Sequence, residues 1–197
     1  PIAGTRPRGK DAKEDSILAN ELKNDSKEIA EHVMLLDLGR NDIGKVAKSG
    51  TVEVTQQFDV EYFSHVMHLV SHVRGELNKD YTSYDALRSS FPAGTVSGAP
   101  KIRAIEIIQE LEPDKRGPYA GAVGFFSTTG AIETCITIRT MIIQEGTAYI
   151  QAGGGIVFDS DPQKEFEETQ HKAQALIASI RDAEEYNNLD KIGQLGY

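Results

Sequence analysis

The sequence is poor in cysteine, tryptophan and long apolar runs, and two of these shortages narrow the class of protein. Cys135 is the only cysteine among 197 residues, so no internal disulfide can form and a reducing compartment is favoured. No apolar run approaches the roughly 20 residues that span a bilayer, and the start does not resemble a leader peptide. We therefore expect a cytoplasmic protein with no membrane partner. Cys135 has apolar neighbours, so we expect its thiol to be buried and inert.

Positive charge is also scarce. The chain has 21 Lys and Arg residues against 30 Asp and Glu, a net charge of −9, and its basic residues are scattered rather than clustered. Nucleic-acid binding needs a concentrated basic surface, so we exclude a nucleic-acid partner and read the acidic excess as a solvated exterior. The hydrophobic content of 39% is ordinary for a chain that buries a sizeable core.

The hydrophobic pattern predicts a mixture of helices and antiparallel strands. Helical spacing and capping residues predict helices over 11–24, 26–40, 84–90, 101–111 and 162–186. Alternating or β-branched runs predict strands over 51–58, 61–77, 120–128, 132–143 and 147–158, with hairpin turns at 129–130 and 145–146. Strands and helices do not alternate regularly, which indicates an α+β fold. We expect one domain over 1–185 and a flexible tail over 186–197.

The segment 91–103 places a loop of small residues directly before a helix. Pro100 suits the first helical turn, and Ser97 or Gly98 can cap ahead of it. The unpaired N–H groups, the helix dipole and Lys101 favour an anion. A phosphate loop needs Lys-Ser or Lys-Thr after its last glycine, whereas alanine and proline follow Gly98, so a small carboxylate fits better. The alternative is a tight turn that introduces a core helix.

Two pairs of glutamates lie three residues apart on expected helices. They are Glu28 with Glu31, and Glu165 with Glu168. The ordinary explanation of such pairs is a solvated helix face. Magnesium, however, binds a few carboxylate oxygens together with water and substrate oxygens, so two helices that each contribute a glutamate form a plausible metal site.

Unusual residues inside expected strands are the remaining candidates. His68 lies among apolar residues, where it can be a core histidine or can transfer protons near neutral pH. Arg139 interrupts a run expected in a sheet core and needs an anionic partner or a cleft. Gly153, Gly154 and Gly155 either form a strand bulge or let a ligand approach the backbone.

Eight blocks of sequence, in one order and spacing, match a known family. They are 1–6, 31–42, 66–71, 91–103, 121–124, 138–139, 151–156 and 167–169. With these blocks the chain, to about residue 183, resembles the C-terminal part of the chorismate-utilising enzymes, and most closely the anthranilate synthase component I branch. The resemblance implies an antiparallel β-sheet sandwich flanked by helices, with the active site in a cleft between layers. It also implies that the upstream half of the enzyme is missing here.

The resemblance assigns roles to individual residues. It implies that Glu31 and Glu168 bind Mg²⁺, which holds the ring carboxylate of chorismate, with support from Glu28 and Glu165. It implies that His68 assists proton transfer and that Thr95 lies near the ring. It further implies that chorismate is bound by Gly4, Thr5, Tyr119, Arg139, Gly153, Gly154 and Gly155. Arg6 and Lys101 are candidates for a supporting positive field.

Residue 3 bears on the product. Relatives that make aminodeoxychorismate typically carry a nucleophilic lysine where this chain has Ala3, so the resemblance points to the anthranilate branch. It implies conversion of chorismate and ammonia to anthranilate and pyruvate, in tryptophan biosynthesis. A glutamine amidotransferase subunit, component II, would supply the ammonia in a hetero-oligomer. The alternatives are another chorismate enzyme, such as an aminodeoxychorismate, isochorismate or salicylate synthase, and a folded or partner-binding piece that is inactive alone.

Overall fold

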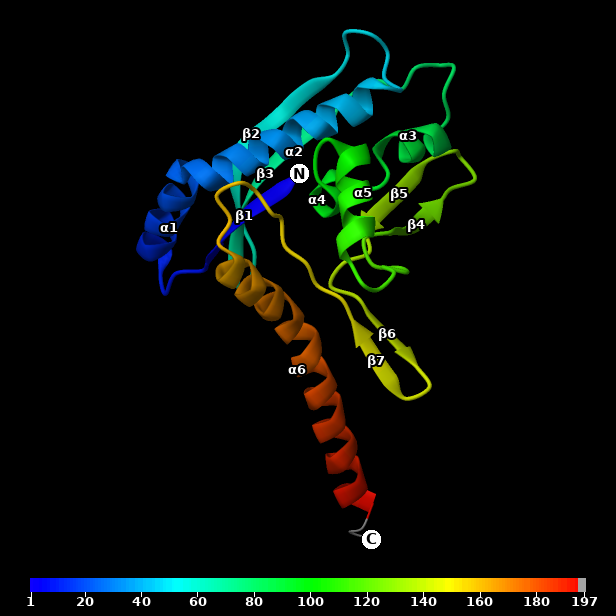
Figure 1. The fold of residues 1–197 in the computed structure, drawn as a ribbon. Coiled ribbons are helices and arrows are strands. Elements are labelled where there is room, and N and C mark those ends of the chain that lie inside the picture. Colours follow the sequence, from blue (N-terminus) through cyan, green and yellow to red (C-terminus); the bar gives the residue numbers. More distant parts are fainter. Residues whose placement is uncertain (195–197) are drawn as a thin grey trace. The chain divides into compact units, whose positions relative to one another are not determined.

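The computed structural model describes residues 1–194, with side chains to residue 186 (Figure 1). The chain divides into two compact units. Residues 1–115 and 122–135 form the first unit, and residues 116–121 with those from 136 onward form the second. The expectation of one domain over 1–185 stays a prediction. No helix within residues 1–194 is long and apolar enough to cross a membrane.

The first unit begins with a strand and two consecutive helices. Helix α1 spans Ala12–Asn24 and helix α2 spans Ser26–Gly44. Asp11 caps α1 by accepting the N–H groups of residues 13 and 14. Asp25 ends α1 and caps α2 in the same way, through the N–H groups of residues 27 and 28. One aspartate therefore satisfies the backbone at the junction of the two helices.

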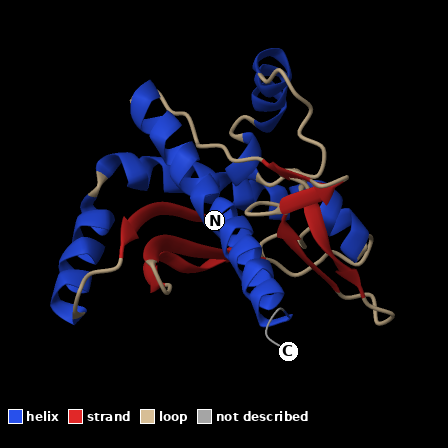
Figure 2. Cartoon of the chain, turned by 90° about the horizontal axis from the view of Figure 1, so that it is seen from below, coloured by secondary structure: helices blue, strands red, loops and turns tan. Residues whose placement is uncertain are grey.

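A three-stranded antiparallel sheet carries the core of this unit. Strand β3 (Val66–Arg74) lies in the middle, between β1 (Ile2–Pro7) and β2 (Glu53–Tyr62). Both helices pack against this sheet (Figures 1 and 2). Met67 and Leu69 of β3 are fully buried with Leu22 and Ala19 of α1. The face of β3 that carries residues 67 and 69 is the core face, which places His68 on the other side of the strand.

A buried histidine joins α2 to the sheet. His32 is fully buried, and its Nε2 lies 2.7 Å from Ser71 Oγ, which accepts the N–H of Phe58 at 3.0 Å. The rings of His32 and Phe58 meet edge to face, with centroids 5.4 Å apart. Within the described residues, Nδ1 of His32 has no hydrogen-bond partner. Burial, with a smaller effect of the positive Pro1 nitrogen, lowers the pKa of His32 to about 4.

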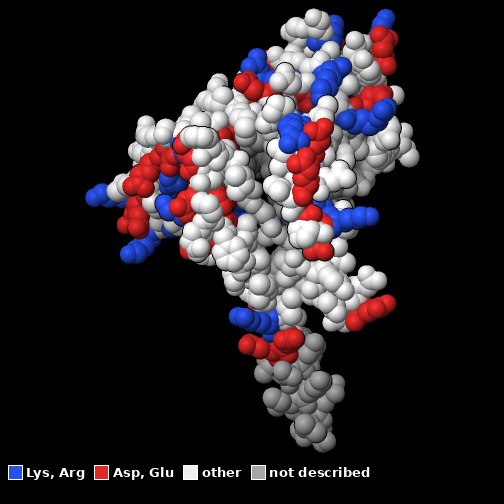
Figure 3. Space-filling model, viewed as in Figure 1, with Lys and Arg blue, Asp and Glu red and all other residues white. Residues whose placement is uncertain are grey.

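The rest of the first unit consists of three helices and a strand pair. The helices are α3 (Ser83–Ser90), α4 (Gly94–Ser97) and α5 (Lys101–Leu111). Strands β4 (Ala122–Phe126) and β5 (Ile132–Ile136) pair through the predicted turn at 129–130. The exterior carries both signs of charge interspersed, as Figure 3 shows for one face.

The second unit contains a hairpin and the long last helix. Strands β6 (Met141–Gln144) and β7 (Thr147–Ile150) pair antiparallel across Glu145 and Gly146, both at positive φ, as a tight hairpin requires. Helix α6 spans Pro162–Gln194. It continues through most of the expected tail, and residues 195–197 lie outside those described. Flexibility of 186–197 therefore stays a prediction.

The mixture of helices and antiparallel pairs confirms the α+β prediction, but several strand predictions were too long. The run 61–77 contains the end of β2, a connection and β3, which spans Val66–Arg74. The run 132–143 is broken between β5 and β6, where Arg139 adopts a left-handed φ of 52°. The run 147–158 ends at Ile150, since the glycines that follow have no side chains to pack. Burial of Cys135 was also wrong: its thiol is exposed, because β4 and β5 form only a two-stranded sheet.

Candidate functional site

The first unit brings His68 against the start of the chain. Its Nδ1 lies 2.9 Å from the carbonyl oxygen of Gly4 and 3.1 Å from Thr5 Oγ1. The pairing of β1 with β3 shifts register between Ala3 and Thr5, and Gly4 has a φ of +72°. This bulge turns the Gly4 carbonyl toward the imidazole. A carbonyl only accepts, so a neutral His68 that donates from Nδ1 keeps Nε2 as the nitrogen that can take a proton.

Glu28 lies beside the same glycine. A Cβ added to Gly4 would lie 3.2 Å from Glu28 Oε2. Arg6 reaches both acidic neighbours, with Nη1 3.5 Å from Glu28 and Nη2 2.8 Å from Asp25. Arg6 is therefore paired with carboxylates of its own unit rather than held ready for an anionic ligand. Glu31 follows Glu28 by about one turn of α2. Five predicted site residues therefore belong to the first unit and to the elements β1, β3 and α2, namely Gly4, Thr5, Glu28, Glu31 and His68.

The loop before α5 differs from its prediction. Ser97 Oγ donates back to Ala93 O at 3.1 Å, so it does not cap α5. Pro100 precedes the helix at the N-cap position and provides no side-chain cap. The prediction of a capped α5 with Pro100 in its first turn was wrong, because the small helix α4 uses Ser97 instead. Thr95 lies exposed within α4.

Lys101 is not directed at an anionic ligand. Its Nζ donates to the buried Asp42 at 2.7 Å and to Ser90 O at 3.0 Å. Asp42 also receives Lys45 Nζ at 2.9 Å. The positive field expected from Lys101 is thus neutralised by a buried carboxylate of α2.

In the second unit, the glycine run lies against polar groups of α6. Lys172 Nζ donates to the carbonyl of Gly153 at 3.1 Å and pairs with Glu168, one turn earlier on the helix. A Cβ added to Gly153 would lie 2.9 Å from Tyr119 Oη. The guanidinium of Arg116 lies 5.5 Å from the centre of the Tyr119 ring. The ring hydroxyl can approach only because residue 153 has no side chain.

The two predicted metal ligands of α6, Glu165 and Glu168, lie beside the next glycine. A Cβ added to Gly154 would lie 3.4 Å from Glu165 Oε2 and 3.9 Å from Glu168 Oε1. Glu165 is 7% exposed, whereas the side chain of Glu168 is about half exposed. Five of the predicted site residues are therefore neighbours in this unit, namely Tyr119, Gly153, Gly154, Glu165 and Glu168.

Arg139 lies on the bend between β5 and β6, and its side chain is exposed. Its expected place in the interior of a strand was wrong, because the chain leaves the strand after Ile136. An exposed guanidinium needs no internal partner and stays available to a carboxylate. Its role as a ligand for substrate stays a prediction, as does that of Gly155.

The carboxylate pairs match the donor chemistry of magnesium. Among the residues that the structure describes, no three His, Cys, Asp or Glu side chains are grouped closely enough to hold a metal ion. Each unit instead contains one of the two predicted glutamate pairs, Glu28 with Glu31 and Glu165 with Glu168. Glu165 and Glu168 lie beside the bare backbone of Gly154, and a cation bound by them would take its other ligands from water and substrate. The residues present therefore fit such a metal.

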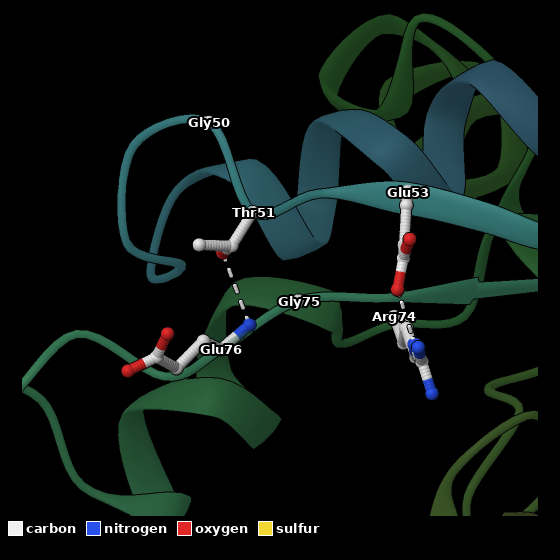
Figure 4. A pocket seen from close by; sticks show the side chains of 6 residues that line it. All are labelled: Gly50, Thr51, Glu53, Arg74, Gly75 and Glu76. Carbon is white, nitrogen blue, oxygen red and sulfur yellow. Dashed lines mark hydrogen bonds and ion pairs between the residues drawn. The ribbon is translucent and has the colours of Figure 1, made fainter.

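A surface pocket at the far end of β2 and β3 is a different feature (Figure 4). Its charged groups are already paired: Arg74 lies 2.5 Å from Glu53, and Glu76 lies 3.4 Å from Lys48. Thr51 Oγ1 also accepts the backbone N–H of Glu76 at 3.1 Å. None of the predicted site residues lines it. The lining residues are Gly50, Thr51, Glu53, Arg74, Gly75 and Glu76.

Sequence reasoning gave no role to Lys172 or Asp42. The spacing of Lys172, four residues after Glu168, is a signal for the helical ion pair. Nothing local to Asp42 indicates its contact with Lys101, which lies 59 residues away.

Comparisons with known proteins identify the family of the chain. The family model described as chorismate binding enzyme matches residues 1–178. Anthranilate synthase component 1 of Acetivibrio thermocellus is 59% identical over 94% of this chain and 37% of its own length. The crystal structure of anthranilate synthase component I from Streptococcus pneumoniae has a TM-score of 0.79 and 51% identity, over 88% of this chain and 40% of that one. The menaquinone-specific isochorismate synthase of Escherichia coli has the same TM-score at 29% identity, over 89% and 40%. The chain thus spans about two fifths of the length of these relatives.

Proposed function

Since the chain belongs to the chorismate binding enzyme family, we propose that it acts as part of an anthranilate synthase large component. The proposed reaction converts chorismate and ammonia to anthranilate, pyruvate and water. Similarity of 55–59% to relatives named anthranilate synthase component 1 supports this branch over the isochorismate synthase at 29%. Ala3 supports it over aminodeoxychorismate synthesis, because alanine cannot act as the nucleophile.

One structural arrangement carries the proposal: Glu165 and Glu168 face the bare backbone of Gly153 and Gly154, with Tyr119 beside it. Chorismate carries two carboxylates. Backbone N–H groups of the glycine run would bind one of them, and Tyr119 with Arg139 would bind that of the enolpyruvyl group. Gly4 and Thr5 would contribute further contacts from the first unit.

Glu31 and Glu168 would bind Mg²⁺, with Glu28 and Glu165 in support. When bound, the metal would neutralise the ring carboxylate of the substrate. Lys172 also pairs with Glu168. The lysine and a divalent cation would therefore compete for this carboxylate.

His68 would move the proton that leaves the ring when pyruvate is lost. Its Nδ1 is held by the Gly4 carbonyl, which fixes the ring and leaves Nε2 to act as the base. Thr95 would lie near the ring of the substrate. The proposed role of His68 rests on the tautomer that the Gly4 carbonyl favours, in which Nδ1 carries the proton.

We further propose a glutamine amidotransferase subunit as the source of ammonia and a hetero-oligomer in the cytoplasm. The designation component 1 of the relatives supports a second component. Because the chain covers about two fifths of those relatives, we expect residues outside it to be needed for turnover.

The test compares the full-length protein with residues 1–197 alone. Each is incubated with chorismate, Mg²⁺ and ammonium, and products are followed by anthranilate fluorescence and by chromatography. We expect anthranilate from the full-length protein and little or none from residues 1–197. Isochorismate or salicylate would favour the second candidate, supported by the isochorismate synthase structure at 29% identity. No product from the full-length protein would refute both.

A further inference from the structure

The second half of α2 holds the loop that carries Thr95. Gly94, the residue before Thr95, lies directly on Leu38 of α2, so close that an added Cβ would collide with the leucine side chain. One turn later on α2, Asp42 binds Lys101 at 2.7 Å. Leu38 and Asp42 are four residues apart and share a helix face. The loop is therefore fixed to one face of α2 at two points.

Lys101 also joins the two ends of the segment 90–101. Its ammonium donates to Ser90 O at 3.0 Å, and these two residues stand at opposite ends of the segment that contains Thr95. The side chains of Lys101 and Asp42 are only 14% and 6% exposed. Thr95 therefore lies between Gly94, which contacts Leu38, and Lys101, whose ion pair with Asp42 is largely buried.

Stability alone does not explain a buried ion pair. Removing two charges from water costs about as much as their attraction returns, so well-packed apolar residues of the same size are often equally stable or more so. Asp42 also pairs with Lys45, but the side chain of Lys45 is 58% exposed. The Lys45 ammonium therefore keeps much of its contact with water, unlike that of Lys101. The Lys101 ammonium donates hydrogen bonds to acceptors on two different helices, Asp42 of α2 and Ser90 of α3. An apolar residue could not make these directional bonds.

We infer that Asp42 and Lys101 are positioning residues that hold Thr95 in place relative to the helix that carries Glu31. This inference rests on the proposed function, in which Thr95 lies near the substrate ring and Glu31 binds the metal. Glu31, Leu38 and Asp42 are spaced by seven and four residues, so they recur on one face of α2. A single rigid helix thereby sets the distance between a metal ligand and the Thr95 loop.

The experiment uses the full-length protein and three variants, Lys101→Met, the double variant Asp42→Asn with Lys101→Met, and Lys45→Met as control. The double variant leaves no unpaired buried charge, so it keeps the measurement possible if Lys101→Met does not fold. The readouts are kcat and KM for chorismate at saturating Mg²⁺ and ammonium, and the melting temperature. Turnover by the unmodified protein is measured first, since its absence would refute the proposed function rather than this inference.

We expect the double variant to melt close to the unmodified protein, yet to lose roughly ten- to a hundredfold in kcat with KM within about twofold. Lys101→Met should lose kcat similarly and also melt lower. Lys45→Met should keep its kcat. A double variant with unmodified kcat, a loss confined to KM, or an equal loss of kcat in Lys45→Met would overturn the positioning role.

Discussion

The buried His32 makes the stability of the first unit depend on pH in a defined window. Its pKa is about 4 in the folded protein, against an ordinary value of 6.5. Between these values the unfolded chain binds a proton that the folded one excludes, so the free energy of unfolding falls as the pH falls from 6.5 toward 4. The full contribution is present above pH 6.5. Burial is the larger cause, so the direction does not depend on the charge of the Pro1 nitrogen.

The size of this effect follows from the gap of roughly 2.5 pH units between the two values. At about 1.4 kcal/mol for each unit, the loss approaches roughly 3 kcal/mol near pH 4 and reaches about 2 kcal/mol at pH 5. Against a typical total of roughly 5–15 kcal/mol, 2 kcal/mol is readily measured.

The matched variant is His32→Gln, which does not titrate and whose amide can still bond Ser71 Oγ. Unfolding in urea is followed at pH 7.5, 6 and 5 by amide exchange in β3, so that the free energy refers to the first unit. Subtracting the variant cancels other titrating groups. We expect the unmodified protein to lose about 2 kcal/mol more than His32→Gln between pH 7.5 and 5.

Equal losses in both proteins would refute this reasoning. An independent check is the NMR titration of the His32 ring, whose signals should stay those of a neutral imidazole down to pH 5. A midpoint near 6.5 would show that the ring is solvated in solution.

Three shorter predictions concern other residues. Glu168→Gln should abolish Mg²⁺-dependent turnover, and unchanged kinetics would remove this residue from the proposed site. Gly153→Ala would place a methyl 2.9 Å from Tyr119 Oη and should raise KM for chorismate about tenfold with little change in kcat; an unchanged KM would count against the glycine run as a binding element. Asp15→Asn should lower the melting temperature at pH 7, because Arg8 and the Gly9 N–H bind this carboxylate and lower its pKa. That difference should shrink as the pH falls below 3.8, and a constant difference would contradict the ion pair.

Local patterns predicted the helices and the hairpin turns well. Asp11 and Asp25 cap α1 and α2, because helix termini depend on nearby side chains. Helix α5 spans the predicted residues although it has no side-chain cap. The break at Arg139 was not predictable in this way. The residues around Arg139 are β-branched, so the local pattern predicts that the strand continues. The strand ends because Arg139 adopts a positive φ, which its local sequence does not indicate.

Contacts between distant residues were beyond local reasoning. The sequence marked Lys101 as a cation at a helix start, but its partner Asp42 is on another helix. Cys135 was expected inside because its neighbours are apolar, yet exposure depends on how many strands flank it. For the candidate site, the family resemblance selected Glu28, Glu31, Glu165 and Glu168 among 30 acidic residues, which spacing alone could not do.

Position 4 favours glycine for two unrelated reasons. Its φ of +72° strains any other residue, and a methyl group there would press on Leu22 at 3.0 Å and Glu28 at 3.2 Å. The same backbone presents the carbonyl that His68 binds. A saturation library at this codon should therefore return mainly glycine, even if selection acts only on folding.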